Sequence, residues 1–413
     1  MGRPQILFIM KGLPYPPMAG SSQRSANLID ALAQVGDVSL FVIGPPDRKP
    51  YLESVGYQVA ATAVPAAQSR SIIGRVLMRF FPNSGENFWR ALSGVKVDFT
   101  PDPGLSETLA QVLAQKRFDL IVGRYLIPSV QAGILDLEFP PVIIDVDDVD
   151  SKSVAAKIFS PASSWVLRSV LKLRLAEVQR REKLLLGRSS GLWFSNPDDL
   201  SMALNIPADV IPNIPYEMPP REELVHSHPN SKTILWVGSF NHRVNLDGVE
   251  LFLRQAWENI RSVNPGVCFR IVGSHLPDAI RQKWEAIPGV EVIGFAESLR
   301  PHYADAAISI IPLMDGAGTK IKVLESLAYL RTCVVTNHSI SGFEHLLRDG
   351  DSVRTVAGLD EFADAISELL NNPQMRHTME NQGREVIEKH FTRDAVRNGV
   401  RQSLHRLLGE MNS

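Results

Sequence analysis

The 413-residue sequence is poor in cysteine and has no long apolar run. Its two cysteines, Cys268 and Cys333, each lie in a short apolar segment of strand length. A disulfide framework is therefore excluded, and buried thiols in a reducing compartment are expected. No segment approaches the roughly 20 apolar residues of a membrane-spanning helix, and the apolar segment 5–10 is too short for the core of a signal peptide. These absences predict a cytoplasmic protein.

An excess of either charge is also missing. The chain carries 43 Lys and Arg residues against 45 Asp and Glu residues, which gives a formal net charge of -2. This balance argues against nucleic acid as a partner. Hydrophobic residues make up 44% of the chain and charged residues 21%, as in an ordinary soluble globular protein. The length allows two or three domains with full-sized cores.

Short apolar strands alternate with helical segments along the first half of the chain. The expected strands are 5–10, 37–44, 118–125, 141–148 and 191–196. This alternation predicts a parallel, doubly wound sheet with helices on both faces. It stops in a proline-rich polar stretch, 210–232, which is the best candidate for a domain boundary.

The alternation restarts in the second half, with expected strands at 233–239, 268–274, 290–295, 306–313 and 332–337. The predicted fold class is therefore α/β, with two doubly wound Rossmann-like domains. We predict domains at 1–212 and 213–388, followed by a C-terminal helix, 389–413, that returns to the first domain. Ligands bind at the carboxyl ends of the strands in such sheets, and the cleft between two facing domains is the expected site.

The segment "DGAGTKIKVLESLA", 315–328, follows an apolar strand and predicts a glycine turn that leads into a helix. Gly316 and Gly318 allow a tight turn and the close approach of a ligand. Thr319 is the expected N-cap. The expected buried stripe of the helix consists of Ile321, Leu324, Leu327 and Ala328.

Thr319, Lys322 and Glu325 recur every three residues on the other side of this helix. Free amides at a helix N-terminus beside a lysine suit a phosphate group. A glutamate one turn further on can accept hydrogen bonds from sugar hydroxyls. An ordinary strand-to-helix turn with a solvated Lys/Glu pair remains the alternative.

The second half resembles the group-one, retaining GT-B glycosyltransferases, most closely over 234–345. The resemblance is carried by "ILWVGSFNHRVNLDGVELFL", "RIVGS", "VIGFAESLRPHYADAAISIIPLMDGAGTKIKVLESLAYLRTCVVTN" and "GFEHLL". The segment 315–328 is similar to a sub-branch with a G-A-G-T-[KR]-x-K-x-x-E donor motif. The opening "PYPPMAGSSQRSANLIDALAQVGDVSLFVIG" is similar to the start of the same family.

This resemblance implies a GT-B fold with two domains facing across a cleft. The second domain would hold a nucleoside-diphosphate sugar and the first an acceptor. The transfer would keep the anomeric configuration and would need no metal and no cofactor. Glu325 matches the glutamate that contacts the donor ribose, while Lys322 and the amides at Gly318 and Thr319 match the diphosphate site.

Two further loops are implied by the same resemblance. Gly238 and Ser239 match the first strand-to-helix turn of the donor domain, near the phosphates. Gly294 and Phe295 match a loop whose backbone borders the nucleotide base.

The sequence departs from the family pattern at three places. Ala317 stands where a glutamate is often found, and Ser239 and Asn245 lie close to the usual arginine and lysine. We expect either that Arg243 supplies the missing positive charge or that Lys322 carries more of it. Arg124 occupies a position that often bears a histidine near the donor sugar.

The chemistry that these residues must perform is stabilisation of the leaving group. A departing nucleoside diphosphate gains negative charge as the anomeric bond stretches. Fixed amides and cations lower this barrier, and losing one such donor typically costs about 3 kcal/mol, or roughly a hundredfold in rate. We assign Lys322, Arg243 and Arg124 to this catalytic role.

The acidic stretch "DVDDVDS", 145–151, supports a different interpretation. Aspartates at a strand end can hold Mg²⁺ or Mn²⁺ against a diphosphate, as in metal-dependent glycosyltransferases of the other major fold. Strand-end acids that cap a helix or face the cleft are the favoured alternative. We assign Asp145 and Asp147 to the acceptor side, together with the helix-start residues Gly20 and Ser21. A mobile surface loop is the alternative for the segment that contains Gly20 and Ser21. No metal ligand is predicted.

Two segments of the first domain are basic and rich in apolar residues, 68–90 and 157–183. Such segments can lie on anionic membrane surfaces, which would suit a lipid-linked acceptor. Helices that pack on the core and expose a basic face are the alternative. We therefore expect a cytoplasmic enzyme, peripheral on the inner face of the membrane if the first interpretation holds.

The sequence predicts a retaining glycosyltransferase that moves a sugar to a glycan or a lipid-linked glycan, in polysaccharide or surface-glycan biosynthesis. A catalytically silent nucleotide-sugar-binding subunit is the alternative from another class. A nucleotide-sugar epimerase or hydrolase on the same fold is the alternative within enzymes, although no pair of carboxylates for sugar-ring chemistry is evident.

Overall fold

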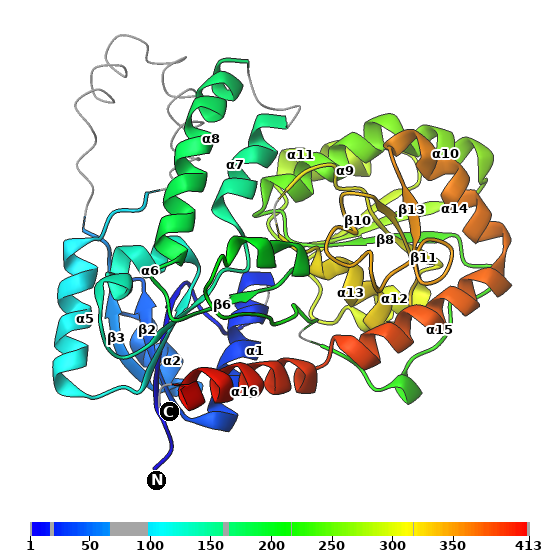
Figure 1. Cartoon of the computed structure of the whole chain (residues 1–413). Coiled ribbons are helices and arrows are strands. Elements are labelled where there is room, and N and C mark those ends of the chain that lie inside the picture. Colours follow the sequence, from blue (N-terminus) through cyan, green and yellow to red (C-terminus); the bar gives the residue numbers. More distant parts are fainter. Residues whose placement is uncertain are drawn as a thin grey trace. The chain divides into compact units, whose positions relative to one another are not determined.

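The computed structural model describes residues 2–16, 20–66, 98–159, 165–215, 217–316 and 318–410. The chain forms two compact units, which are drawn in Figure 1. Unit 1 comprises Met1–Pro212 together with Asp394–Ser413, and unit 2 comprises Asn213–Arg393. Each unit is built on a parallel sheet with helices packed against it.

The described part of unit 1 contains a seven-stranded sheet in the order β3-β2-β1-β4-β5-β6-β7. Its strands are β1 Gln5–Lys11, β2 Asp37–Ile43, β3 Val59–Ala63, β4 Leu120–Arg124, β5 Val142–Asp145, β6 Gly191–Phe194 and β7 Ala208–Val210. All neighbouring strands pair in parallel. The central strands are buried along most of their length because helices cover both faces of the sheet, which explains their near-continuous apolar sequences.

The helices of unit 1 connect these strands. They are α1 Gly20–Val35, α2 Arg48–Ser54, α5 Pro103–Gln115, α6 Leu126–Ala132, α7 Asp150–Phe159, α8 Trp165–Leu186 and α16 Arg393–Glu410. Short 3₁₀ turns lie at Ile134–Asp136 and Pro197–Met202. Helix α5 begins at Pro103, and the Asp102 carboxylate accepts hydrogen bonds from the amides of Gly104 and Leu105, as an N-cap should.

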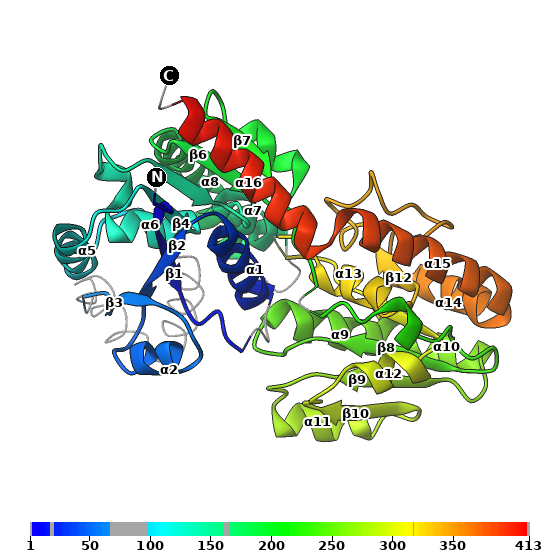
Figure 2. The same cartoon turned by 90° about the horizontal axis from the view of Figure 1, so that it is seen from below.

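The last helix, α16, packs on unit 1 although unit 2 separates it from the rest of that unit in sequence. The Trp193 indole on β6 donates a 2.8 Å hydrogen bond to Ser403 Oγ on α16. Arg397 pairs with Asp30 on α1 at 2.9 Å. Figure 2 shows α16 lying beside α1, β6 and β7. The division between the units falls after Arg393, because α15 continues to His390, whereas the sequence placed it after residue 388.

The described part of unit 2 contains a six-stranded parallel sheet in the order β10-β9-β8-β11-β12-β13. Its strands are β8 Thr233–Val237, β9 Cys268–Val272, β10 Val290–Gly294, β11 Ile308–Ile311, β12 Cys333–Thr336 and β13 Arg354–Val356. Its helices are α9 Arg243–Gln255, α10 Trp257–Val263, α11 Asp278–Glu285, α12 Arg300–Asp305, α13 Ile321–Ala328, α14 Phe362–Asn371 and α15 Pro373–His390. Short 3₁₀ turns lie at Arg221–Glu223 and Leu359–Glu361.

Each sheet has its own apolar core, so the side chains of the two units pack separately. In unit 2 the core contains several aromatic side chains, with Trp236, Trp257 and Trp284 fully buried beside Phe252 and Phe269. Edge-to-face and tilted ring pairs lock these side chains in place. Closely packed aromatic side chains therefore support the carboxyl ends of β8 and β9. No helix in the described ranges is long and apolar enough to cross a membrane.

Helix α13 is short but well anchored. Val323, Leu324, Leu327 and Ala328 are buried, whereas Ile321 at its first position is only half-buried. The predicted stripe is thus wrong at one end, because the helix begins at Ile321 and its first turn is partly exposed. Leu327 packs against Gly383 of α15 so closely that a Cβ on that glycine would lie 2.6 Å from Leu327 Cδ2.

Candidate functional site

Two parts of the predicted donor site lie together. They are Gly238, in the first strand-to-helix turn of unit 2, and Lys322, in the helix that follows the glycine turn. A Cβ on Gly238, just after β8, would lie 3.1 Å from Lys322 Nζ on α13. It would also lie 3.0 Å from the ring of Trp236. A side chain at this position would therefore crowd the lysine and the tryptophan, which would have to move by a few tenths of an ångström. The Lys322 ammonium sits over the Trp236 ring, 4.8 Å from its centroid, in a cation–π contact.

Asn245, in the first turn of α9, links this lysine to the loop after β8. Its Oδ1 accepts a 2.6 Å hydrogen bond from Lys322 Nζ, and its Nδ2 donates a 2.6 Å bond to the Ser239 carbonyl. The sequence identified Asn245 only as a substitute for a basic residue of the family. In the structure Asn245 contacts Lys322. The sequence signal for this role was the position of Asn245, close to where the family usually has a lysine.

Burial perturbs the charges at the start of α13. It lowers the pKa of Lys322 to about 7, an effect that Lys320 reinforces and Glu325 opposes. Burial raises the pKa of Glu325 to about 7, which Lys322 opposes and Glu217 reinforces. Both groups thus change charge close to neutral pH. An anion placed beside Lys322 would favour its charged form and gain binding energy from it.

Thr319 does not cap α13, so that prediction was wrong. The N-cap position is Lys320, and no side chain caps the helix there. The Thr319 hydroxyl instead accepts a 2.6 Å hydrogen bond from Asn213 Nδ2, at the beginning of unit 2. The first-turn amides of α13 therefore lack a side-chain cap, which leaves the end of the helix as the kind of place where anions bind.

Arg243 was expected to supply positive charge near the phosphates. Arg243 begins α9, its side chain is 78% exposed, and its Nε pairs with Asp247 at 2.9 Å. It would have to leave this exposed i,i+4 pair to meet a phosphate, which costs little. Its catalytic role stays a prediction.

The loop after β10 is held by backbone contacts. Gly294 has φ +81°, and its carbonyl accepts a 2.8 Å hydrogen bond from the Gly273 amide. A Cβ on Gly273 would lie 2.0 Å from the Gly238 carbonyl oxygen, so the ends of β8 and β9 approach as closely as backbones can. Phe295 follows with a ring that is 59% exposed. The assigned base-binding loop is therefore hydrogen-bonded at Gly294 to the residue after β9, and it exposes Phe295.

In unit 1 the predicted residues Arg124, Asp145 and Asp147 form a buried ionic cluster with Arg24. Asp145 accepts from Arg24 at 2.5 Å and pairs with Arg124 at 2.9 Å, while Arg124 pairs with Asp147 at 2.7 Å. The two carboxylates raise the pKa of both arginines although burial opposes this. Two positive and two negative charges balance inside the cluster.

The cluster lies at the carboxyl ends of β4 and β5, where ligands bind in such sheets. Tyr125 and Asp147 both have positive φ, +67° and +40°, which is strained for residues other than glycine. Asp145 is fully buried between the two guanidinium groups and presents no surface to an acceptor. The catalytic assignment of Arg124 and the acceptor-side assignment of Asp147 stay predictions.

Gly20 and Ser21, also assigned to the acceptor side, form the first turn of α1. Arg24 on the next turn reaches Asp145, which places this end of the helix over the end of β5. The acidic stretch continues into α7, where Glu182 of α8 accepts a 2.7 Å hydrogen bond from the Asp150 amide. Burial, with Glu182 and Asp148, raises the pKa of Asp150 to about 7. Within the described ranges, no group of three or more His, Cys, Asp or Glu residues is arranged to hold a metal ion.

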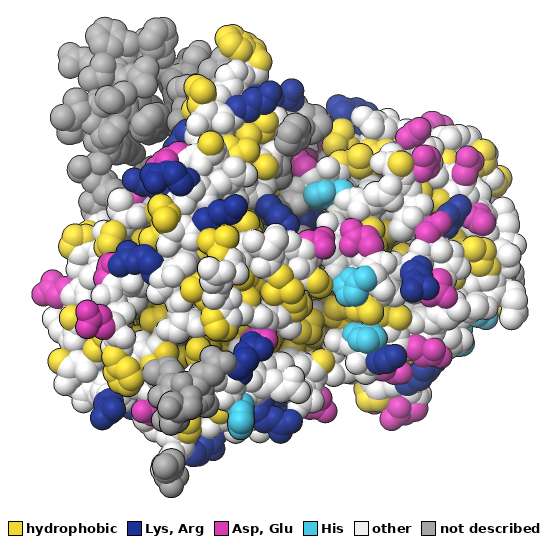
Figure 3. All heavy atoms as spheres, viewed as in Figure 1, with side chains coloured by type: hydrophobic (Ala, Val, Ile, Leu, Met, Phe, Trp, Pro, Cys, Tyr) yellow, Lys and Arg dark blue, Asp and Glu magenta, His cyan; other side chains and the backbone are white. Residues whose placement is uncertain are grey.

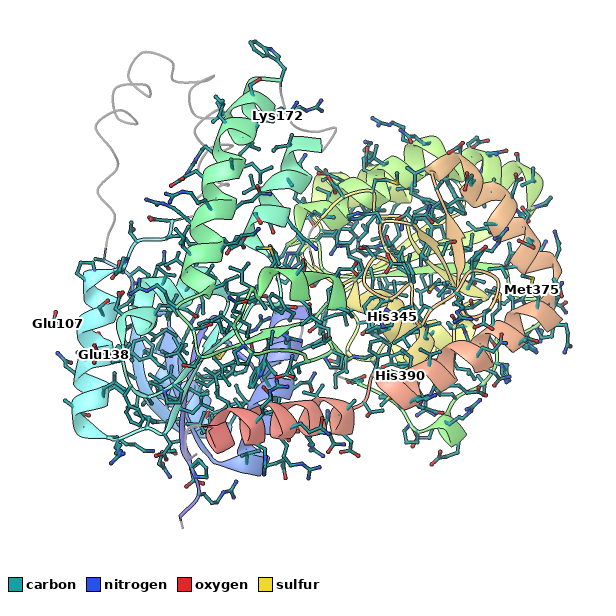
Figure 4. The ribbon with its side chains drawn as sticks, viewed as in Figure 1. Glu107, Glu138, Lys172, His345, Met375 and His390 are labelled. Carbon is teal, nitrogen blue, oxygen red and sulfur yellow. The ribbon has the colours of Figure 1, made fainter. Side chains whose placement is uncertain are left out.

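The basic segment 68–90 lies outside the described residues, while most of 157–183 is described as part of α7 and α8. Glu177 pairs with Arg180 and Arg181, which neutralises part of the basic face of α8. Nearer its beginning, Trp165 is 79% and Leu173 is 83% exposed. Figure 3 shows hydrophobic and basic side chains mixed over this helix, and Figure 4 shows Lys172 on its outer part.

Comparison with known proteins places these observations in a family context. Residues 231–372 match the family described as Glycosyl transferases group 1. The matched range includes Lys322 and its contacts Gly238 and Asn245. A search of curated proteins found no match.

Solved structures show which fold the whole chain has. Sucrose-phosphate synthase from Thermosynechococcus elongatus is 16% identical with a TM-score of 0.67, covering 99% of this chain and 100% of that one. HepE of Anabaena, solved with UDP and glucose, is 12% identical with a TM-score of 0.65, covering 97% and 99%. A TarM mutant of S. aureus, solved with UDP, fondaparinux and α-GlcNAc-glycerol, is 10% identical with a TM-score of 0.64, covering 98% and 99%.

This chain has the GT-B fold. The predicted fold class, two Rossmann-like α/β domains, is confirmed. The match over 231–372 and the fold together support a glycosyltransferase.

Proposed function

We propose that the chain is a retaining glycosyltransferase that uses a nucleoside-diphosphate sugar and needs no metal. The observation that carries the proposal is the position of Lys322. Its ammonium lies against Gly238 and Asn245, and Glu325 follows one helical turn later, all inside the segment that matches the group 1 family. HepE and TarM, which share the fold, were both solved with UDP.

In this proposal the residues of unit 2 bind the donor and stabilise its leaving group. The Lys322 ammonium and the amides at Gly318 and Thr319 receive the negative charge of the departing diphosphate. The Glu325 carboxylate accepts hydrogen bonds from the ribose hydroxyls, and the loop at Gly294 and Phe295 borders the base. Burial lowers the pKa of Lys322 to about 7, so an anion beside it favours its charged form.

The acceptor is a glycan or a lipid-linked glycan, which unit 1 holds. Helix α8 supports an additional contact of this unit with an anionic membrane surface. Exposed Trp165 and Leu173 lie on the same helix as exposed Lys172 and Arg174, the combination that binds lipid interfaces.

Sedimentation with anionic and with neutral liposomes tests this contact. Native protein should bind anionic vesicles in a salt-sensitive manner, and Leu173→Asp should bind them at least about threefold more weakly. Glu107→Ala, on exposed surface of α5, is the control. Equal recovery of native protein with both vesicle types would remove the membrane from the proposal and leave the donor site untouched.

Calorimetry of nucleotide binding tests the donor site. UDP, GDP, ADP and dTDP are titrated, with EDTA present, into native protein and into Glu325→Ala. One nucleotide should bind with a Kd in the micromolar range, about 8 kcal/mol of binding free energy, and the substitution should weaken it at least tenfold. Glu385→Ala, an exposed glutamate on α15 of the same unit, is the matched control.

The outcome distinguishes metal-dependent from metal-independent binding. Binding that begins only after Mn²⁺ is added would shift attention to the acidic stretch 145–151. Failure of all four nucleotides under both conditions would contradict the donor-site assignment.

A catalytically silent donor-binding subunit is the second candidate. The favouring observation is Arg124, whose charge is already balanced by Asp145 and Asp147 at a position where the family often has a histidine. Tight nucleotide binding without release of the nucleoside diphosphate from its sugar, in the presence of acceptor lipids, would favour this candidate.

A further inference from the structure

Lys320 is a buried lysine whose ammonium group is occupied by backbone carbonyls of the glycine turn. Its Nζ donates to the Gly316 carbonyl at 2.9 Å and to the Gly318 carbonyl at 2.7 Å. The side chain is 8% exposed, and the residue itself occupies the N-cap position of α13. A lysine this deeply buried needs hydrogen-bond acceptors, and here the turn provides them.

A second side chain holds the same turn from another element. His338, just after β12, places Nε2 2.9 Å from the Gly316 carbonyl oxygen. Gly316 and Gly318 both have positive φ, +105° and +74°, which other residues adopt only with strain. A conformation available to glycine is flexible by itself, so an ordered turn requires such external contacts.

The direction of the carbonyls decides where the amides point. In a trans peptide the N–H lies opposite the C=O. The peptide that joins Gly318 to Thr319 turns its carbonyl toward Lys320, so the Thr319 amide is directed away from that lysine. This amide is one of those assigned to the diphosphate.

The two lysines of the motif therefore have different contacts. Lys322 faces a side-chain amide and the Gly238 turn, where an incoming anion can replace Asn245 as its partner. Lys320 faces two backbone carbonyls of the glycine turn itself. We propose that Lys320, assisted by His338, is a positioning residue that orders the glycine turn for the diphosphate without touching the diphosphate itself. This inference rests on the proposed donor site.

Hydrogen exchange of the nucleotide-free protein tests the positioning role, followed by titration of the same four nucleoside diphosphates. In Lys320→Met, amides in the peptide 314–322 should exchange at least about fivefold faster than in native protein. Nucleotide affinity should fall at least about tenfold. Lys322→Met should weaken binding similarly while exchange of this peptide stays within about twofold of native. Lys389→Met, an exposed lysine on α15, is the surface control.

Two conservative variants separate hydrogen bonding from charge. Lys320→Gln keeps a group that donates to carbonyls but has no charge, and it should recover most of the slow exchange and most of the affinity. If Lys320 instead bound phosphate through its charge, Lys320→Arg would recover affinity and Lys320→Gln would not. The glutamine variant also decides the matter if Lys320→Met fails to fold.

Exchange in Lys320→Met at the native rate would overturn the inference, whatever happens to affinity. Faster exchange with unchanged affinity would overturn it too, because the order of the turn would then be irrelevant to the ligand. If no nucleotide binds native protein, the proposed function fails, and the exchange data alone still show whether Lys320 orders the turn.

Discussion

At the residue scale, the pair Lys322 and Glu325 gives the candidate site its electrostatic character. The two side chains lie one helical turn apart, partly buried, with Lys320 and Glu217 as further charges near them. Burial pulls both pKa values toward 7 from opposite sides. The ligand assigned to them needs both ionised, because the diphosphate requires an ammonium group and the ribose hydroxyls require a carboxylate.

Nucleotide affinity should therefore be greatest near neutral pH. Above about pH 7 the free protein has lost the Lys322 proton and must take it up to bind, so affinity falls as pH rises. Below about pH 7 Glu325 is protonated and must lose its proton to accept from the ribose, so affinity falls as pH drops. Calorimetry between about pH 5.5 and 9 in paired buffers of different ionisation enthalpy measures both the affinity and the protons exchanged.

Single substitutions should each remove one half of this pH dependence. In Lys322→Met the affinity should no longer fall as pH rises, and in Glu325→Gln it should no longer fall as pH drops. Both variants should bind the nucleotide more weakly than native protein. A native affinity that stays constant across the range would contradict the assigned pair.

At the scale of elements, strand ends and helix starts in both units are joined by polar contacts over long sequence separations. In unit 2, Asn245 of α9 joins the end of β8 to α13. In unit 1, Arg24 of α1 joins the ends of β4 and β5 through Asp145 and Arg124. The first is partly exposed and can exchange partners with a ligand. The contact in unit 1 is buried, so its main effect is to fix the local structure and not to bind a ligand.

Breaking the buried cluster should destabilise unit 1 strongly. Asp145→Asn removes the carboxylate that pairs with two guanidinium groups and should lower the free energy of unfolding by about 3–5 kcal/mol, because charges remain buried without their partner. Urea unfolding followed by tryptophan fluorescence measures the change.

Asp136→Asn provides the comparison for this effect. Asp136 pairs with Arg188 at 2.5 Å on the surface, and its loss should cost no more than about 1 kcal/mol. Equal effects of the two substitutions would show that the buried cluster does not support the ends of β4 and β5.

At the scale of the whole molecule, the chain leaves unit 1, forms unit 2, and returns to unit 1 with α16. Val396, Val400, Leu404 and Leu407 of this helix are buried. Ile211, near the end of the first pass through unit 1, lies close to Gly399, where a Cβ would meet its Cδ1 at 3.0 Å. The core of unit 1 is therefore complete only when α16 has docked.

A charge on the docked face of α16 should loosen unit 1 and leave unit 2 unaffected. Val400→Asp buries an unpaired carboxylate and should cost unit 1 about 4 kcal/mol, whereas Gln402→Asp on the exposed face should cost little. Hydrogen exchange resolved by peptide separates the two units. Faster exchange in unit 2 peptides as well would contradict the division of the chain at Arg393 and Asp394.

Much of this architecture follows from the sequence alone. Apolar runs of strand length, separated by helical segments, determine two parallel sheets because a strand buried on both faces must be apolar throughout. The glycines at 238, 294, 316 and 318 marked the loops, and the last three have the positive φ that few other residues adopt. The resemblance over 234–345 then pointed to Lys322 and Glu325. These are local or periodic properties, and a sequence displays them directly.

Only the tertiary structure decided which side chains meet. Asn245 accepts a hydrogen bond from Lys322, Thr319 bonds to Asn213 in place of capping α13, and Asp145 is enclosed by two arginines. Lys320 and Lys322 look equivalent in the motif, yet one faces carbonyls and the other faces the Gly238 turn. A contact between residues far apart in sequence depends on the orientation of packed helices and on which side chain fits. That competition among neighbours has no signature in any short stretch of sequence.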